Sequence, residues 1–476
     1  MDSDYALLTD FYELTMANGY LLKGIADKTA VFNLFFRKAP FNGVYAICYG
    51  VNKALKGIQA MKFSKEDITY LQGLKVFSDQ FLDYLTHWKC ELTIRAIEDG
   101  RVIFPQEPII EVEGPLIQCQ LMETYLLNSF NFPTLCATKA NRMWLTSGKQ
   151  PILEFGLRRA QGPNGGLTAS EAAIVGGCAS TSNVLAGKKY GITVSGTQAH
   201  SWVMAFKTEL DAFRAYAELY PNSCILLVDT YDTLRSGVPN AITVGKELAA
   251  KGKKLLGIRL DSGDLAVLSR KAREMLDQAG FKDAKIVASN DIDEYIIEEI
   301  QSKKGAVDIW GIGTKLATCF DQPALGGVYK LVEIDKEAKM KIASDIGKTT
   351  LPSKKQIYRV YDKKDSMMGD IIELENMKFH IEDPVYNLSD PSNPSKLQNT
   401  SKLEPLLEIK MRKGKVLGTD FDWRSARKKV EEDIEHLPKE SKRLSDPWPY
   451  MVFISQPLFN LRLKLIEQYT AKKSSS

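Results

Sequence analysis

Six short clusters of polar or glycine residues each follow an apolar run in the middle of the sequence, and they could bind a phosphorylated substrate. Arginines bind phosphate or carboxylate in a bidentate manner, and glycines let the backbone approach a phosphate. With carboxylates that could accommodate Mg²⁺, these residue types indicate group transfer involving a polyphosphorylated sugar. The clusters are Phe155–Arg159, Thr197 with His200, Asp229–Asp232, Arg259–Asp264, Asn290–Asp291 and Gly311–Lys315.

His200 is the residue in these clusters that could accept a phosphoryl group. It lies between a β-prone run, Ile192–Ser195, and an apolar repeat over Ser201–Leu219 that predicts a long amphipathic helix. A helix N-terminus favours an anion and disfavours a protonated imidazole. A neutral His200 facing an anion is therefore a candidate phosphate acceptor, and the alternative is a histidine that only caps its helix.

The elements that must position these clusters alternate between strand and helix. Six consecutive strand–helix units predict parallel strands, and in barrel enzymes the carboxyl ends of such strands carry the active site. We therefore predict an irregular TIM-like α/β barrel over residues 146–344, although the pattern alone leaves an open doubly wound sheet possible. The predicted strands are Ile152–Phe155, Ile192–Ser195, Cys224–Val228, Lys254–Ile258, Ala284–Ala288 and Val307–Ile312.

The two flanking segments are predicted to form one α+β domain. Residues 1–145 mix helix and strand without regular alternation, and residues 345–476 are expected to pack back on them. Helical patterns in the second segment cover Ser425–Leu437 and Leu458–Tyr469. Residues 472–476 are expected to be disordered.

Composition narrows the class of protein. A chain of 476 residues with a net charge of +4 has room for two domains and gives no reason to expect nucleic acid or a membrane as partner. No signal peptide or transmembrane run is visible, so we expect a cytoplasmic protein. The seven cysteines form no CxxC pair and the four histidines no HxxxH pair, so a zinc-type site is not expected.

Separated motifs, all in the same order, resemble those of the nicotinate phosphoribosyltransferase family, which has the type II phosphoribosyltransferase fold. The resemblance extends almost to the C-terminus. The matching runs are Leu8–Met16, Phe35–Arg37, Glu154–Gly162, Thr181–Asn183, Gly196–Ser201, Arg259–Asp264 and Gly311–Thr314.

This resemblance implies a reaction in NAD biosynthesis. Nicotinate and 5-phosphoribosyl 1-diphosphate would give nicotinate mononucleotide and diphosphate, coupled to ATP hydrolysis. The histidine that matches His200 is transiently phosphorylated by ATP in that family. Asp229 and Asp261 would orient Mg²⁺ or the ribose.

The resemblance also implies substrate contacts. Phe155 would stack on the pyridine ring, with Tyr12 of a neighbouring subunit on the opposite face, which implies a homodimer with shared active sites. Arg259 and Thr197 would receive the nicotinate side. Arg158, Gly313 and Thr314 would lie near phosphate groups.

A later segment, Pro352–Arg359, resembles a family segment whose lysines lie near the phosphates. Lys354 and Lys355 are therefore candidate phosphate ligands. Ser353 stands where the family usually has glycine, and a solvated basic run is the alternative interpretation.

Two other activities remain as alternatives. In the related family that uses nicotinamide, an aspartate occupies the position of Ser182; a serine hydroxyl can donate to a carboxylate, which favours nicotinate. A sugar-phosphate isomerase or aldolase on a barrel would instead use Lys315 as a Schiff-base residue.

Overall fold

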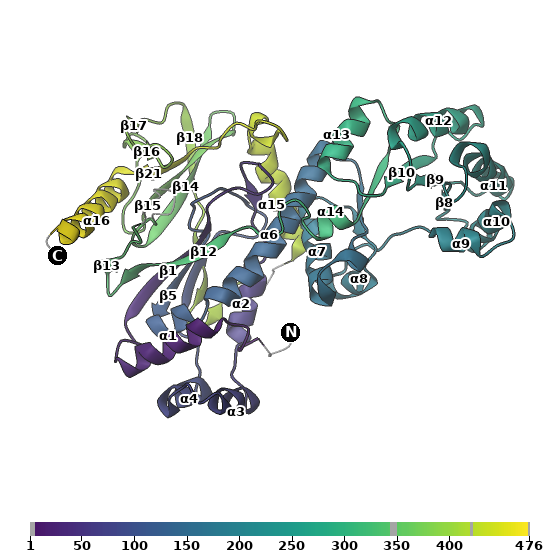
Figure 1. Ribbon diagram of the computed structural model, residues 1–476. Helices are drawn as coiled ribbons and strands as arrows, with labels where there is room; N and C mark the ends of the chain where they lie inside the picture. The colour runs from purple at the N-terminus through teal and green to yellow at the C-terminus, as the bar shows by residue number, and fades with distance from the viewer. Residues whose placement is uncertain (1–4, 343–349, 419–421, 475–476) are drawn as a thin grey trace. The chain divides into compact units, whose positions relative to one another are not determined.

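The computed structural model describes residues 5–342, 350–418 and 422–474, and side chains as far as Tyr469. The chain divides into two compact units (Figure 1). Unit 1 comprises residues 1–135 and 324–476, and unit 2 comprises residues 136–323. The predicted boundaries, at 145/146 and 344/345, therefore assign about ten and twenty residues differently.

In unit 1, one seven-stranded sheet contains strands from both the N-terminal and the C-terminal segments of the chain. Its central strand β1 (Thr29–Phe36) pairs antiparallel with β5 (Ile110–Pro115) on one side and with β12 (Gly327–Ile334) on the other. Residues 327–338 thus belong to unit 1 and not to the predicted barrel, because their apolar strand completes this sheet. The full order is β13 (Glu337–Ala338), β12, β1, β5, β3 (Thr93–Ala96), β19 (Glu408–Arg412) and β20 (Lys415–Val416).

A second sheet of unit 1 comes entirely from the C-terminal segment. Its strand order is β17 (Pro394–Ser395), β16 (Val385–Asn387), β21 (Val452–Ser455), β15 (Met367–Leu374), β14 (Lys355–Asp362) and β18 (Thr400–Pro405).

The core beside this sheet contains Val360, Ile371, Phe379 and Phe453. A two-stranded sheet joins β2 (Ala46–Ile47) and β4 (Val102–Ile103).

Seven helices of unit 1 have bounds within the described residues, and α6 continues into unit 2. Helix α16 (Gln456–Ser474) contradicts the predicted disorder of residues 472–474, because Lys472 and Lys473 are residue types that favour a helix and continue it. Residues 475 and 476 lie outside the described residues. The other helices are α1 (Phe11–Leu22), α2 (Val51–Ala60), α3 (Lys65–Gly73), α4 (Asp79–Thr86), α5 (Leu116–Gln120), α6 (Glu123–Thr146) and α15 (Trp423–His436).

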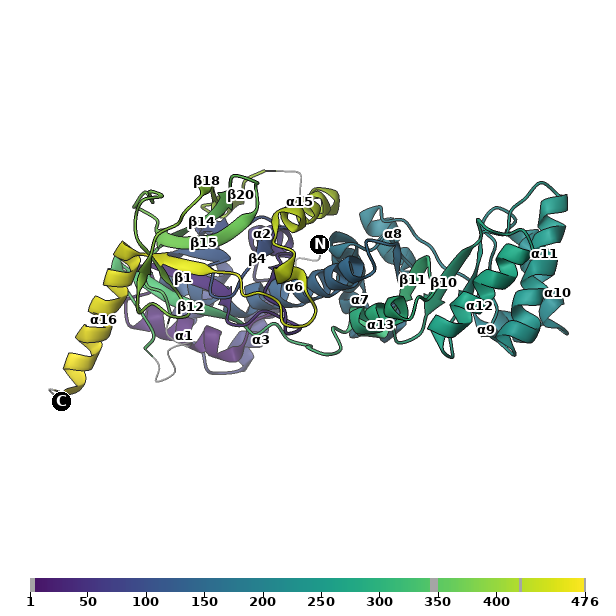
Figure 2. The same cartoon turned by 90° about the horizontal axis from the view of Figure 1, so that it is seen from above.

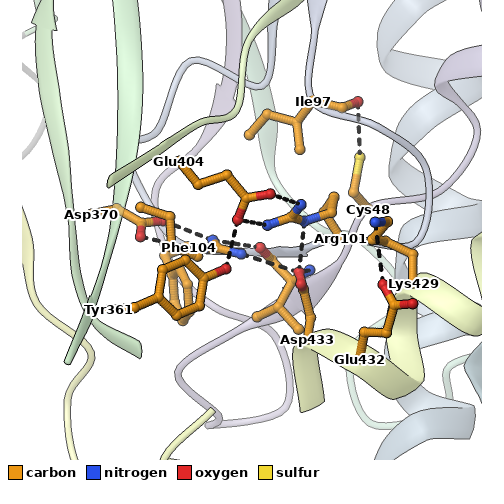
Figure 3. A network of polar contacts seen from close by, with 12 residues as sticks. Cys48, Ile97, Arg101, Phe104, Tyr361, Asp370, Glu404, Lys429, Glu432 and Asp433 are labelled. Carbon is orange, nitrogen blue, oxygen red and sulfur yellow. Dashed lines mark hydrogen bonds and ion pairs between the residues drawn. The ribbon is translucent and has the colours of Figure 1, made fainter. Parts of the chain in front are cut away.

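A buried ion network joins distant segments of unit 1 (Figure 3). Arg359 on β14 donates to both carboxylate oxygens of Asp370 on β15, at 3.0 and 2.7 Å. It also donates to Asp433 on α15 (3.1 Å), which accepts from Arg101 as well (2.9 Å). Arg101 forms a bidentate pair with Glu404 on β18. These contacts fix the C-terminal strands and α15 to the residue 101 loop.

Unit 2 contains a six-stranded parallel sheet. This sheet confirms the predicted α/β fold class. Helices α10, α11 and α12 lie beside its β8–β10 side (Figures 1 and 2). The strand order is β7 (Ser180–Thr181), β6 (Ile152–Glu154), β11 (Ile309–Ile312), β10 (Lys285–Ser289), β9 (Gly257–Leu260) and β8 (Ile225–Leu227). The longer helices are α7 (Gly162–Gly176), α10 (Glu209–Leu219), α11 (Val238–Ala250), α12 (Leu265–Gln278) and α13 (Glu294–Ser302).

The strand predicted at Ile192–Ser195 is wrong: within the described residues this segment contributes a single β-bridge, between Val194 and Thr181 of β7. Four residues later, the Gln198 amide lies at the other edge of the sheet, where the orientation that satisfies its oxygen and nitrogen donates to the Ile225 carbonyl (2.8 Å) and accepts from Leu227 N (3.2 Å). One bridge and one side-chain amide therefore connect the two edges, in place of the continuous strand pairing of a regular barrel.

Among the helices of the described residues, none is both long enough and apolar enough to span a bilayer.

Candidate active site

Arg259 is the centre of the polar side chains that collect at the carboxyl ends of the unit 2 strands. It lies on β9, and its guanidinium donates from Nε to Ser289 Oγ (2.7 Å), from Nη1 to Thr197 Oγ1 (2.9 Å) and from Nη2 to Asp261 Oδ1 (2.7 Å). These contacts use three of the five guanidinium N–H groups, which leaves two without a partner among the described residues. The site therefore presents an oriented cation with free donors.

The Phe155 ring lies beneath this cation, with the Arg259 Cζ atom 5.5 Å from the ring centroid. Phe155 follows β6 directly and is buried. Gly311 on the neighbouring strand makes room for it, because a Cβ there would lie 2.8 Å from a ring carbon. Gly311 thus accommodates an aromatic ring, whereas the sequence suggested close approach to a phosphate.

Asp261 connects Arg259 to His200. Its Oδ1 accepts from Arg259 and from the Ser289 hydroxyl, and its Oδ2 lies 3.7 Å from His200 Nε2. Burial alone would raise the pKa of this carboxyl, but the Ser289 hydrogen bond and the charges of Arg259 and His200 outweigh it and lower the pKa. Asp261 is therefore ionised at neutral pH.

His200 begins α9 (His200–Met204), as the sequence predicts, but the long helix predicted after it is wrong. The helix ends at Met204, and α10 begins separately at Glu209 because the Thr208 hydroxyl accepts from Asp211 N and caps a new N-terminus. A five-residue helix has little dipole to offer an anion. The surroundings of His200 are set instead by Asp261 at Nε2 and by the Thr230 hydroxyl, 3.1 Å from Nδ1.

Asp229 lies beside Asp261 and has one oxygen unused. Its Oδ2 accepts from Asp261 N (2.8 Å) and from Ser262 Oγ (2.6 Å), whereas Oδ1 is buried with no partner in the described part of the chain. No group of three or more metal-ligating side chains occurs among the described residues. Two carboxylates fit the sparse protein coordination of Mg²⁺, which usually completes its shell with waters and substrate phosphates.

The remaining predicted residues of unit 2 lie next to these groups in the chain or in the sheet. Ser182 follows β7, half-buried, and its N–H donates to the Glu154 carbonyl (2.9 Å). Gly313 lies close to Phe155, since a Cβ there would be 3.3 Å from the Phe155 carbonyl oxygen. It precedes the short helix α14 (Thr314–Ala317). Arg158 is exposed in the turn η1 (Leu157–Arg159).

Two acidic residues of the clusters cap the helices that follow them. Asp264 caps α12 by accepting from Val267 N (3.0 Å), and Asp232 accepts from Leu234 N and Arg235 N. Lys315 lies 3.5 Å from the Asp293 carboxylate, and its ammonium lies 4.3 Å from the centroid of the Phe320 ring. These two contacts occupy the amine that a Schiff-base mechanism would use, which disfavours the aldolase alternative.

Tyr12, Lys354 and Lys355 belong to unit 1. Tyr12 on α1 is 44% exposed, and burial of the hydroxyl together with nearby Glu123 raises its pKa. Lys354 forms ion pairs with Glu113 (2.8 Å) and Glu375 (3.5 Å). Lys355 is buried, and its ammonium donates to the Leu351, Pro352 and Ser353 carbonyls. The Lys355 ammonium is therefore occupied within its own loop, which does not support a phosphate contact.

Sequence reasoning missed Ser289 and Thr230 as contributors to the site. Ser289 ends β10, immediately before Asn290–Asp291, and contacts both Arg259 and Asp261. Its position as a polar residue at the carboxyl end of an apolar strand is the signal that could have found it. Thr230 follows Asp229 in one of the clusters and was overlooked in favour of the carboxylates.

The parallel α/β sheet of unit 2, with an arginine, two carboxylates and a histidine at its carboxyl edge, defines a class of enzyme that binds an anionic substrate at strand ends. Comparison with known proteins makes this specific. The sequence matches the profile of the nicotinate phosphoribosyltransferase (NAPRTase) family over residues 151–373, and the profiles of its N-terminal and C-terminal domains over residues 7–131 and 354–462. The chain belongs to the nicotinate phosphoribosyltransferase family.

Individual relatives agree over nearly the full length. The chain is 40% identical to nicotinate phosphoribosyltransferase of Bacillus subtilis, covering 99% of this chain and 97% of that one. It is 34% identical to the human protein of that name over 95% of each chain. The crystal structure of human nicotinic acid phosphoribosyltransferase superimposes with a TM-score of 0.86 at 31% identity, covering 96% of this chain and 100% of that one.

Proposed function

We propose that this protein is a nicotinate phosphoribosyltransferase that forms nicotinate mononucleotide and diphosphate from nicotinate and 5-phosphoribosyl 1-diphosphate, as a step of NAD biosynthesis. The observation that carries the proposal is the Arg259 guanidinium, held over the Phe155 ring with two N–H groups free. The names of the full-length relatives support the same reaction.

Nicotinate recognition follows from this pair. A flat aromatic ring can stack on Phe155, and its carboxylate can accept from the free N–H groups of Arg259. Thr197, already bonded to Arg259, limits rotation of the guanidinium. In a homodimer, Tyr12 of a second subunit would cover the other face of the pyridine ring, and its exposure on α1 leaves it accessible for that role.

Ribosyl transfer places positive charge on the sugar and negative charge on the leaving diphosphate. Asp229 and Asp261 lie side by side at the strand ends, where carboxylates stabilise a developing cation. The unpartnered Asp229 Oδ1 and the outer oxygen of Asp261 are the atoms that would hold Mg²⁺. When bound, the ion would neutralise charge on the diphosphate. Thr314, Gly313 and Arg158 are the candidates for the 5′-phosphate.

Coupling to ATP is assigned to His200. We assign the proton to Nε2, which faces the Asp261 carboxylate at 3.7 Å, and the reacting lone pair to Nδ1, from which the Thr230 hydroxyl would have to turn away. Nδ1 would attack the terminal phosphorus of ATP, breaking the bond to ADP and forming phosphohistidine, which water later hydrolyses. The phosphorylated and free forms would favour different ligand sets, so that ATP hydrolysis drives mononucleotide formation.

The test separates transfer from coupling. The wild type and His200→Ala are incubated with labelled ATP and Mg²⁺, then assayed for acid-labile, base-stable protein phosphate and for mononucleotide formation. We expect phosphate on the wild type alone, and partial ATP-independent synthesis by His200→Ala. Equal protein phosphate in both forms would exclude His200, and absence of mononucleotide from the wild type would exclude the reaction.

Nicotinamide is the alternative substrate to nicotinate, and the residue that would select between the two is Ser182. An aspartate at this position would repel the nicotinate carboxylate but accept from an amide nitrogen. Ser182→Asp should therefore reduce kcat/KM for nicotinate at least about tenfold more than for nicotinamide, as like-charge repulsion of about 1.4 kcal/mol requires. Equal losses for both substrates would show that Ser182 does not select between them.

A further inference from the structure

Glu154, the last residue of β6, is a fully buried carboxylate that the steps above do not use. One oxygen, Oε1, accepts from Gly156 N. The other, Oε2, accepts from the Thr181 hydroxyl on β7 (2.5 Å) and from the Ser170 hydroxyl on α7 (2.9 Å). Gly156 N and the Thr181 hydroxyl thus converge on this carboxylate, and the Ser170 hydroxyl shares its one proton between Oε2 and the Gly166 carbonyl (2.9 Å).

Two of these donors, Gly156 in the turn after β6 and Thr181 on β7, lie beside the two walls of the proposed nicotinate pocket. Gly156 directly follows Phe155, the ring on which nicotinate would stack, and Thr181 directly precedes Ser182, the residue that would select the acid. The main chain reinforces the link, since Ser182 N donates to the Glu154 carbonyl (2.9 Å). One carboxylate therefore fixes both walls.

The turn after β6 has little freedom to compensate if this carboxylate is lost. A Cβ at Gly156 would lie 2.3 Å from the Ala317 side chain and 2.9 Å from the Gly313 carbonyl, so the turn packs tightly against the loop and helix α14. On the other side, Thr181 Oγ1 accepts from Asn183 N (3.0 Å), and Asn183 caps α8 (Val184–Tyr190) through Ala186 N (3.1 Å). A shift of Thr181 would therefore also move Ser182.

We infer that Glu154 is a positioning residue of the aromatic-acid pocket: its buried carboxylate sets the separation between Phe155 and Ser182, and so the affinity for nicotinate. This inference rests on the proposed function. The Glu154 carboxylate touches no substrate in this assignment, and it acts through the two residues that do.

Glu154→Gln tests the inference with a nearly isosteric change. The amide replaces one acceptor oxygen by a donor, so Gly156 N and the Thr181 and Ser170 hydroxyls can no longer all donate to this side chain, and at least one of these three groups must turn or shift. We expect the KM for nicotinate to rise about tenfold, while the KM for 5-phosphoribosyl 1-diphosphate and the kcat change less than about twofold. A general loss of folding would not produce this split between substrates.

Two further variants complete the test. Ser170→Ala removes a donor to the same carboxylate and an acceptor of the Asn183 side-chain amide (3.1 Å), but it leaves the Gly156 and Thr181 bonds to Glu154 in place. Its nicotinate KM should therefore change less than about twofold. Thr181→Val removes the donor beside Ser182 and should raise the nicotinate KM several-fold, so it replaces Glu154→Gln if that variant does not fold. Equal KM changes for both substrates, or equal effects of Ser170→Ala and Thr181→Val, would overturn the role of Glu154. A wild type without nicotinate turnover would overturn the proposed function itself.

Discussion

Two arginines, one in each unit, have similar surroundings and opposite accessibility. Arg259 and Arg359 both lie over an aromatic ring, at 5.5 Å from Phe155 and 5.4 Å from Phe104. The Arg359 side chain is 0% exposed and uses four of its five N–H groups on Asp370, Asp433 and the Val102 carbonyl. Arg259 is 13% exposed and uses three.

This difference separates a structural charge from one that can bind a ligand. The carboxylates around Arg359 match its donors, so the network holds strands and helix together and leaves no donor directed at solvent. Around Arg259, hydroxyls take two of the three bonds and a single carboxylate takes the third, so the positive charge is only partly balanced. An anionic ligand can complete its coordination.

Removing Arg359 should have the largest effect on stability. Arg359→Met leaves Asp370 buried beside Glu107 without its cation and Asp433 with Arg101 as its remaining cation, and we expect the free energy of unfolding to fall by about 3–5 kcal/mol. Urea denaturation, with hydrogen exchange of unit 1 peptides to locate the loss, measures this. Arg424→Met is the control, because Arg424 pairs with Asp422 at the surface and should cost under about 1 kcal/mol. Equal losses in both variants would contradict a structural role specific to Arg359.

Changing Arg259 should instead affect catalysis. Arg259→Lys keeps a positive charge but loses the planar fork, so we expect kcat/KM for nicotinate to fall about 100-fold. Stability should change by less than about 1 kcal/mol, since the side chain is not fully enclosed. Steady-state kinetics and urea denaturation of the same preparation give both values. A stability loss as large as that of Arg359→Met would erase the distinction between the two arginines.

The comparison also explains which features the sequence could predict. The parallel strands of unit 2 and most of the clusters at their carboxyl ends follow from local patterns, because five of the six clusters adjoin the end of a strand and only Thr197 with His200 does not. The short strand β7 and the β-bridge at Val194 do not, since two residues carry too little periodicity to identify a strand. Thr208 is a residue type that caps helices, and its cap divides the predicted helix in two. The apolar repeat on both sides of Thr208 nevertheless predicts one continuous helix.

The ion network of unit 1 could not be predicted from the sequence for a different reason, which is the separation of its members along the chain. Arg101 contacts Glu404 and Asp433, more than 300 positions away in the sequence. Nothing local to Arg101 or to Arg359 on β14 distinguishes a buried, fully partnered arginine from an exposed one. The same applies to Lys355, which looks like part of a basic surface run and lies on the buried side of its strand.

Lys355 provides the smallest and most specific effect, because it is a buried cation whose ammonium is bonded to carbonyls alone. Burial lowers its pKa from 10.5 to about 8, although Glu111 and Glu333 oppose the change. Between these values the unfolded chain binds more protons than the native one, so stability from this group increases with pH above about 8. The stability of the wild type relative to Lys355→Met should therefore rise by about 1 kcal/mol between pH 8 and pH 9.

Lys354→Met is the matched control for this pH effect. Burial alone would lower the pKa of Lys354, but the hydrogen bond and charge of Glu113 raise it above its ordinary value. Its contribution to stability is then fully present below pH 10.5 and should not change between pH 8 and pH 9. Urea denaturation of the three proteins at both pH values measures the difference. If the stability difference between the wild type and Lys355→Met does not change between pH 8 and pH 9, water reaches the ammonium. A buried cation in this fold would then need a carboxylate partner, as Arg359 does.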